Sequence, residues 1–195
     1  MVLIVIDLVQ DYFNPALWPN SRLPESRQRL VTATNELAAL FRAKNFPIIW
    51  FRQEFAPDLS DAFLHMKQSG KLYAIRGKAG CQLLPELQVA PEDRILVKKR
   101  YSAFFQTELD AVLSHLQPHT LVLAGITTAW CVRSTAVDAY QRDYRVLLAQ
   151  DAMAGFIERD HLESLNAMNE LVGTALSNAE IARVIVNSEA HTGSY

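Results

Sequence analysis

Cysteine is scarce in this chain of 195 residues, which contains only Cys81 and Cys131. Two cysteines argue against a disulfide framework and indicate a reducing compartment. No apolar run approaches the roughly 20 residues that a transmembrane helix needs. A basic block and a repeated aromatic platform are also absent, and the net charge is -2, so we expect no nucleic-acid partner. These absences favour a cytoplasmic globular protein that spans no membrane.

The first residues lack the marks of a secretion signal. Val2 to Ile6 are apolar, but no basic leader precedes them and no small-residue cleavage site follows them, so this run predicts a buried strand. Of all residues, 50% are hydrophobic and 21% are charged, which suits one compact domain. We find no repeat, linker or low-complexity tract. We therefore expect a single domain over residues 1–195, with a loose tail from about residue 187.

Apolar runs of strand length alternate with segments of helical periodicity along most of the chain. The expected strands are residues 2–6, 46–51, 94–97, 121–124, 144–149 and 173–176. The expected helices are residues 24–44, 107–116, 132–140 and 159–171, and a last helix with a capping box of Ser177 and Glu180. Residues 55–93 show no clear pattern. This alternation predicts an α/β fold of three α/β/α layers around a mostly parallel sheet of about six strands.

Three reactive side chains follow predicted strands. Asp7 ends the first strand, Lys98 ends the third, and Cys131 begins the helix after the fourth. The carboxyl ends of parallel strands meet at one edge of a sheet, so we expect these residues in one cleft. A lysine and a helix N-terminus both lower the pKa of a thiol, and a carboxylate can accept its proton.

Each of these residues also has a structural interpretation. A strand-end aspartate often caps a turn, Lys98 could belong to a solvated patch with Lys99 and Arg100, and a cysteine is often a small buried apolar residue. Together, however, the three favour a nucleophilic site.

Three sequence blocks, in order, resemble those of the isochorismatase-like cysteine hydrolases. The blocks are VLIVIDLVQDYF (residues 2–13), ILVKKRYSAFFQTEL (residues 95–109) and LAGITTAWCVRSTAVDAY (residues 123–140). That family includes nicotinamidases, N-carbamoylsarcosine amidases, ureidoacrylate amidohydrolases and isochorismatases. The resemblance implies a homo-oligomer that acts on a small amide or carbamoyl compound.

The resemblance also implies roles for individual residues. Asp7 would be the acid and base, Lys98 the charge partner and Cys131 the nucleophile that forms a thioester. The Ile126–Thr127 peptide bond would be cis, and the backbone amides of Thr127 and Cys131 would form the oxyanion hole.

One family feature is missing after the second predicted strand. Nicotinamidases carry an Asp-x-His metal motif there, whereas this chain has Arg52, Gln53 and Glu54, with a solitary His65 downstream. Two ligands make a poor metal site. We therefore expect no metal and no cofactor, and we do not expect a nicotinamidase.

Substrate contacts are harder to predict. Arg52 could hold a carboxylate in a bidentate fork, although a surface arginine is an equal alternative. Phe13, Trp18, Tyr101 and Trp130 could line the pocket, although aromatic residues in such a fold are more often core. We assign no role to His115, His119 or His161, and we expect Cys81 to be inert.

Two other functions stay open. An isochorismatase-type vinyl-ether hydrolase would use the aspartate as an acid without needing a cysteine nucleophile. A catalytically silent α/β protein would act through interactions, but it would have no use for three reactive groups on one edge. Retention of Cys131 with its surrounding block favours the amide chemistry.

Overall fold

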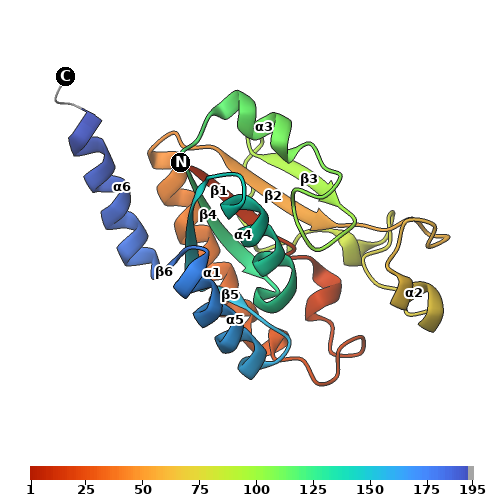
Figure 1. Ribbon diagram of the computed structural model, residues 1–195. Coiled ribbons are helices and arrows are strands. Elements are labelled where there is room, and N and C mark those ends of the chain that lie inside the picture. The colour runs from red at the N-terminus through yellow and green to blue at the C-terminus, as the bar shows by residue number, and fades with distance from the viewer. Residues whose placement is uncertain (193–195) are drawn as a thin grey trace.

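The computed structural model describes residues 1–192 of the chain, and residues 193–195 lie outside the described part (Figure 1). The elements are, in order, β1 (Val2–Ile6), η1 (Gln10–Phe13), α1 (Leu23–Ala43), β2 (Ile48–Gln53), α2 (Leu64–Ser69), η2 (Ala79–Cys81), β3 (Arg94–Lys98), α3 (Leu109–Leu116), β4 (Thr120–Ile126), η3 (Thr128–Val132), α4 (Arg133–Tyr140), β5 (Arg145–Ala154), α5 (Glu158–Leu171), β6 (Thr174–Leu176) and α6 (Asn178–Thr192). None of the helices in residues 1–192 is both long and apolar enough to cross a membrane.

The six strands form one sheet in the order β3-β2-β1-β4-β5-β6, and every neighbouring pair is parallel. This confirms the predicted fold class. From β1 the chain builds outward to β2 and β3, and then returns to the other side of β1 for β4, β5 and β6. The strand order therefore reverses between β1 and β4, and ligands of open parallel sheets bind beyond such a reversal point.

Both faces of the sheet are covered by helices, as Figure 1 shows. The alternating side chains of the strands divide the core in two. Leu3 and Val5 pack with residues of α1 and α6, whereas Ile4 and Ile6 pack with residues of α3, α4 and α5. All five residues of β1 are buried, which explains its uninterrupted apolar sequence.

Gly125 lets β4 lie close to β1. Its φ angle is +108°, in a region that side-chain-bearing residues rarely adopt. A Cβ atom on this residue would also lie 2.0 Å from the carbonyl oxygen of Ile6. Glycine is therefore required at the point where the chain leaves the sheet toward Cys131.

Several boundaries differ from the sequence prediction. Strand β5 continues to Ala154, beyond the polar pair Gln150 and Asp151, because it pairs with β4 again after a register shift. The capping box at α6 is confirmed: Glu180 N donates to Ser177 Oγ, and Ser177 N donates to Glu180 Oε2. Helix α6 runs to Thr192, where we expected a loose tail from about residue 187.

The candidate active site

The three predicted catalytic residues meet at the reversal point of the sheet. Lys98 Nζ lies 2.6 Å from Asp7 Oδ2 and 3.4 Å from Cys131 Sγ. Asp7 and Lys98 are completely buried, and Cys131 is 5% exposed. Three segments far apart in the chain thus place an acid, a cation and a thiol in mutual contact.

Each side chain reaches the site from the carboxyl end of a different strand. Asp7 follows β1 and adopts a left-handed backbone conformation, with φ of +54°, which aspartate tolerates better than most residues. Lys98 ends the edge strand β3 opposite Gln53 of β2. Its long side chain extends past β2 to Asp7, where a shorter one would stop.

All three donor hydrogens of the Lys98 ammonium group have a partner. Besides Asp7 and Cys131, it donates to the backbone carbonyl of Arg100 at 2.9 Å. An ammonium group has three N–H donors and no acceptor, so these contacts fix its orientation and favour its charged form. Burial alone would lower the pKa of Lys98, but the negative charges of Asp7 and of ionised Cys131 outweigh burial and raise it.

Burial has the opposite effect on the two acidic groups. It raises the pKa of Asp7, and the opposing attraction of Lys98 only partly cancels it. It also raises the pKa of Cys131 to about 12, against the lowering effect of Lys98. Our expectation of a lowered thiol pKa is therefore wrong, because the cost of burying a thiolate exceeds what one lysine supplies. The resting thiol is neutral.

The nucleophile sits in a turn that differs from the predicted helix start. Residues Thr128–Val132 form a π-helical turn, and α4 begins only at Arg133. The peptide bond between Ile126 and Thr127 is cis, as the family resemblance implied. The amides of Trp130 and Val132 both donate to the carbonyl of Thr127, on either side of the Cys131 amide in sequence.

Three tyrosines lie near enough to the thiol for a charge on it to affect them. Burial is the main cause that raises the pKa values of Tyr12, Tyr73 and Tyr101, and negative charge at Cys131 raises all three further. Tyr101 was predicted here, and its ring lies 5.4 Å from that of Trp130. Tyr12 and Tyr73 were missed. Tyr12 belongs to the first family-like block and could have been found, whereas Tyr73 lies in the stretch without a pattern.

A continuous aromatic wall joins these tyrosines to neighbouring rings. Trp18 contacts Tyr12 and Tyr73 at centroid distances of 5.9 and 5.1 Å. Phe63 stacks on Tyr101 at 4.7 Å. Trp130 is 54% exposed, so it marks the outer edge of this wall.

Two of the residues predicted to contact the substrate have other contacts within the protein. Phe13 is a core residue, 4% exposed, in the cluster that packs against α1. The Arg52 guanidinium pairs with Glu54 at 3.1 Å and donates to Gln82 at 2.6 Å. The Arg52 fork is therefore occupied within the protein, and the substrate roles of Phe13 and Arg52 stay predictions.

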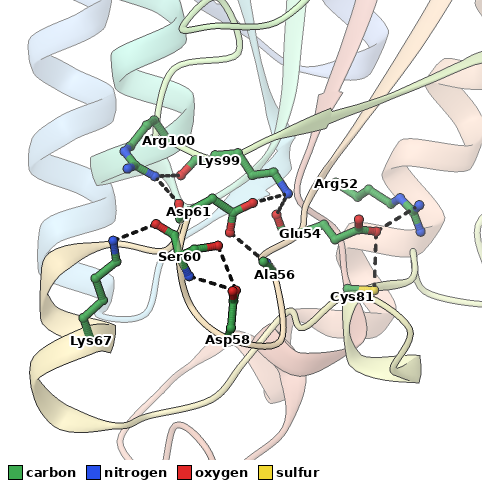
Figure 2. A network of polar contacts seen from close by, with 10 residues as sticks. All are labelled: Arg52, Glu54, Ala56, Asp58, Ser60, Asp61, Lys67, Cys81, Lys99 and Arg100. Atoms are coloured by element: carbon green, nitrogen blue, oxygen red, sulfur yellow. Dashed lines mark hydrogen bonds and ion pairs between the residues drawn. The ribbon is translucent and has the colours of Figure 1, made fainter.

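The residues between β2 and α2 are attached to the end of β3 by a polar network centred on Asp61 (Figure 2). The Asp61 carboxylate accepts from the amide of Ala56 at 2.7 Å and pairs with Lys99 at 3.0 Å. Arg100 donates to the Asp61 carbonyl at 2.8 Å, and its guanidinium lies over the ring of Phe63. This network holds one side of the aromatic wall in place.

The residues considered for a metal have other partners. Glu54 is paired with Arg52 and lies 3.8 Å from the sulfur of Cys81 (Figure 2), while His65 contacts the hydroxyl of Tyr73 at 3.0 Å. Among the residues that the structure describes, no group of three or more His, Cys, Asp or Glu side chains could hold a metal ion. Cys81 is fully buried, with its sulfur 3.2 Å from the carbonyl of Lys78.

The chain and its fold have relatives among known proteins. The uncharacterized isochorismatase family protein YecD of Escherichia coli O157:H7 is 27% identical over 191 residues, covering 94% of this chain and 95% of that protein. An isochorismatase family protein from Desulfovibrio vulgaris has a solved structure that superimposes with a TM-score of 0.84 at 27% identity, covering 95% of this chain and 97% of that one.

A shorter match, of higher identity, is to an enzyme of named activity. The ureidoacrylate amidohydrolase RutB of Pantoea ananatis is 43% identical over 83 residues, which cover 43% of this chain and 33% of that protein. A sequence profile described as the isochorismatase domain matches residues 1–180. The chain therefore belongs to the isochorismatase family of hydrolases.

Proposed function

We propose that this protein is a cysteine amidohydrolase that cleaves a carbon–nitrogen bond in a small amide, ureido or carbamoyl compound. The observation that carries the proposal is the buried contact of Lys98 with both Asp7 and Cys131. Isolated buried charges are costly, and an amidohydrolase has a direct use for this acid, cation and thiol. The 83-residue similarity to a ureidoacrylate amidohydrolase supports this reaction class.

The first chemical step is a proton transfer inside the site. The Cys131 thiol is neutral at rest, and Asp7 is a stronger base than an exposed aspartate because its pKa is raised. Asp7 takes the thiol proton as the sulfur attacks the substrate carbonyl carbon, so the thiolate forms only when it is used. Lys98 remains charged throughout and stabilises whichever of its two neighbours carries the negative charge.

The tetrahedral intermediate places a negative charge on the former carbonyl oxygen. We assign its stabilisation to the backbone amides of Thr127, directly before the turn that follows the cis bond, and of Cys131, within that turn. Protonated Asp7 then gives its proton to the leaving nitrogen, and ammonia or an amine departs from a thioester. Water attacks the thioester with Asp7 again as base, which releases the acid and restores the thiol.

The surroundings of the sulfur favour a small substrate. Cys131 is 5% exposed, and Tyr12, Tyr73 and Tyr101 lie close enough to feel its charge. The Tyr12 hydroxyl donates to Gln53 and that of Tyr73 contacts His65, so these two tyrosines act mainly through their rings, which exclude bulk water.

Ammonia release across a panel of small amides, ureido acids and carbamoyl compounds tests the proposal. We expect at least one of them to be hydrolysed by the wild-type protein and by Cys81→Ser, but not by Cys131→Ala or Cys131→Ser. Hydrolysis that survives in Cys131→Ala would overturn the assignment of the nucleophile, and a panel that releases neither ammonia nor an amine would overturn the reaction class.

A further inference from the structure

A buried histidine that the proposed chemistry does not use contacts the turn that carries the nucleophile. His161, in the first turns of α5, is 8% exposed. Its Nδ1 atom lies 2.7 Å from the hydroxyl oxygen of Thr128. Thr128 is fully buried and is the first residue of η3, directly after Thr127.

The hydrogen bonds around this hydroxyl group have one assignment that satisfies both contacts. Thr128 Oγ1 also lies 3.0 Å from the carbonyl oxygen of Ala154, at the end of β5. A carbonyl can only accept, so the single hydroxyl hydrogen of Thr128 points to Ala154. The Nδ1 atom of His161 must then carry a hydrogen and donate it to Thr128. These two hydrogen bonds form a relay from His161 in α5 through Thr128 to Ala154 in β5.

The histidine is held firmly enough to fix its partner. A Cβ atom on Gly155 would lie 3.2 Å from the Cβ atom of His161, so the loop before α5 packs directly on this residue. Burial lowers the pKa of His161, Arg29 lowers it further, and Glu158 partly opposes both. The ring is therefore neutral at neutral pH and keeps one hydrogen to donate.

We infer that His161 is a positioning residue: by holding Thr128 against Ala154, it aims the backbone amides of Thr127 and Cys131 at the oxyanion. This inference rests on the proposed function, because it assumes that an oxyanion forms at that place. His161 touches neither the substrate nor the reacting atoms. Its effect passes through one hydroxyl group and the turn that begins there.

Adduct formation with a small aldehyde tests the inference without knowledge of the substrate. The Cys131 sulfur adds to the carbonyl carbon of the aldehyde, and the thiol proton moves to the aldehyde oxygen. The product is a tetrahedral thiohemiacetal, whose oxygen occupies the oxyanion hole. Acetaldehyde labelled with ¹³C at the carbonyl carbon reports this adduct by its chemical shift, and titration gives its affinity. Alkylation of Cys131 by iodoacetamide serves as the control, since displacement at a saturated carbon forms no oxyanion.

Two pairs of variants of matched shape separate the hydrogen bond from packing. The substitution His161→Asn retains an amide hydrogen near the place of Nδ1, whereas His161→Leu fills the same space without a donor. Thr128→Ser keeps the hydroxyl group, and Thr128→Val removes it. We expect His161→Leu and Thr128→Val to weaken the adduct about 10-fold or more, less than the roughly 10²–10³-fold loss when an oxyanion donor is removed outright.

The conservative variants and the control complete the expected result. His161→Asn and Thr128→Ser should form the adduct nearly as well as the wild-type protein, and alkylation rates should agree within about 2-fold in all folded variants. The double variant His161→Leu with Thr128→Val should be no weaker than either single variant, because both break one relay. Thermal unfolding identifies folded variants, and Thr128→Val carries the test if His161→Leu does not fold.

Three results would overturn the inference: an unchanged adduct in folded His161→Leu or Thr128→Val, equal weakening in His161→Asn and His161→Leu, or a wild-type protein that forms no adduct. Failure of the proposed function looks different. In that case no amide in the panel releases ammonia, although the adduct forms and still differs between the variants.

Discussion

At the scale of single residues, burial governs the chemistry of the site. Asp7, Lys98 and Cys131 share a volume without room for bulk water, so only one of the two acidic groups can carry a negative charge beside Lys98 at low cost. A helix end or a neighbouring lysine suffices to form a stable thiolate at an exposed site, but not here. The proton therefore moves within the site during the reaction.

The pH dependence of activity should report Asp7. This residue must be deprotonated to accept the thiol proton, so activity should rise with pH as Asp7 ionises. Since the pKa of Asp7 is raised from the ordinary 3.8, the pH at which activity increases should lie above 3.8. Asp7→Asn should lower kcat by about 10²–10⁴-fold and abolish the rise. Steady-state rates between pH 4 and pH 8 measure both effects, and an unaltered profile in Asp7→Asn would contradict the role.

Alkylation should report the raised pKa of the thiol. With a pKa of about 12 for Cys131, the thiolate fraction grows about tenfold per pH unit through the neutral and alkaline range. Iodoacetamide should thus modify Cys131 at a rate that keeps rising between about pH 7 and pH 10. Mass spectrometry of the Cys81→Ser variant follows this one site. An alkylation rate that no longer increases with pH above neutral pH would show a stabilised thiolate and contradict the raised pKa.

At the scale of elements, the contact between β1 and β4 sets the distance between acid and nucleophile. Asp7 follows Ile6, and the turn with Cys131 follows Gly125 and Ile126. The two strands pair up to the last residue of β1, with Ile6 opposite Gly125. A change in this pairing would move Asp7 relative to Cys131.

Gly125→Ala should therefore be severely destabilising. Its Cβ atom would lie 2.0 Å from the Ile6 carbonyl oxygen at a φ angle of +108°, so the strands must separate. Gly70→Ala is the matched control, because Gly70 also has a positive φ angle, of +67°, but has nothing within 4 Å. We expect a cost of about 1 kcal/mol at Gly70 and about 3 kcal/mol or more at Gly125. Urea unfolding measures both; similar costs would show that close packing at Gly125 is unimportant.

At the scale of the whole molecule, the sequence predicts the sheet and the three reactive residues because each ends or follows an apolar strand. The carboxyl ends of such strands share one edge whatever the loops do. Tyr73 and His161 were not predicted as site residues, because their positions depend on how residues 55–93 and α5 pack. The prediction that the pKa of the Cys131 thiol is lowered was wrong for the same reason, because composition does not reveal how deeply a side chain at the end of a strand is buried.

The same packing bears on metal dependence. Glu54 is paired with Arg52, and His65 with Tyr73, so the two side chains first considered as ligands are engaged elsewhere. We predict that dialysis against a chelator leaves the rate of amide hydrolysis unchanged, and that added zinc or manganese does not increase it. The comparison uses one substrate from the ammonia panel. Loss of activity with the chelator and recovery with one metal would reopen a nicotinamidase-like site.

The central claim is that Cys131 forms a covalent thioester during hydrolysis of a small amide. The most direct test is to quench the reaction with acid during turnover and to analyse the intact and digested protein by mass spectrometry. Our account predicts a mass increase equal to the acyl part of the substrate, located on the peptide with Cys131 and absent from the peptide with Cys81. The adduct should disappear when the substrate is consumed and should not form in Cys131→Ala. Hydrolysis without any adduct, at a rate that Cys131→Ala retains, would contradict the account and favour acid catalysis by Asp7 alone.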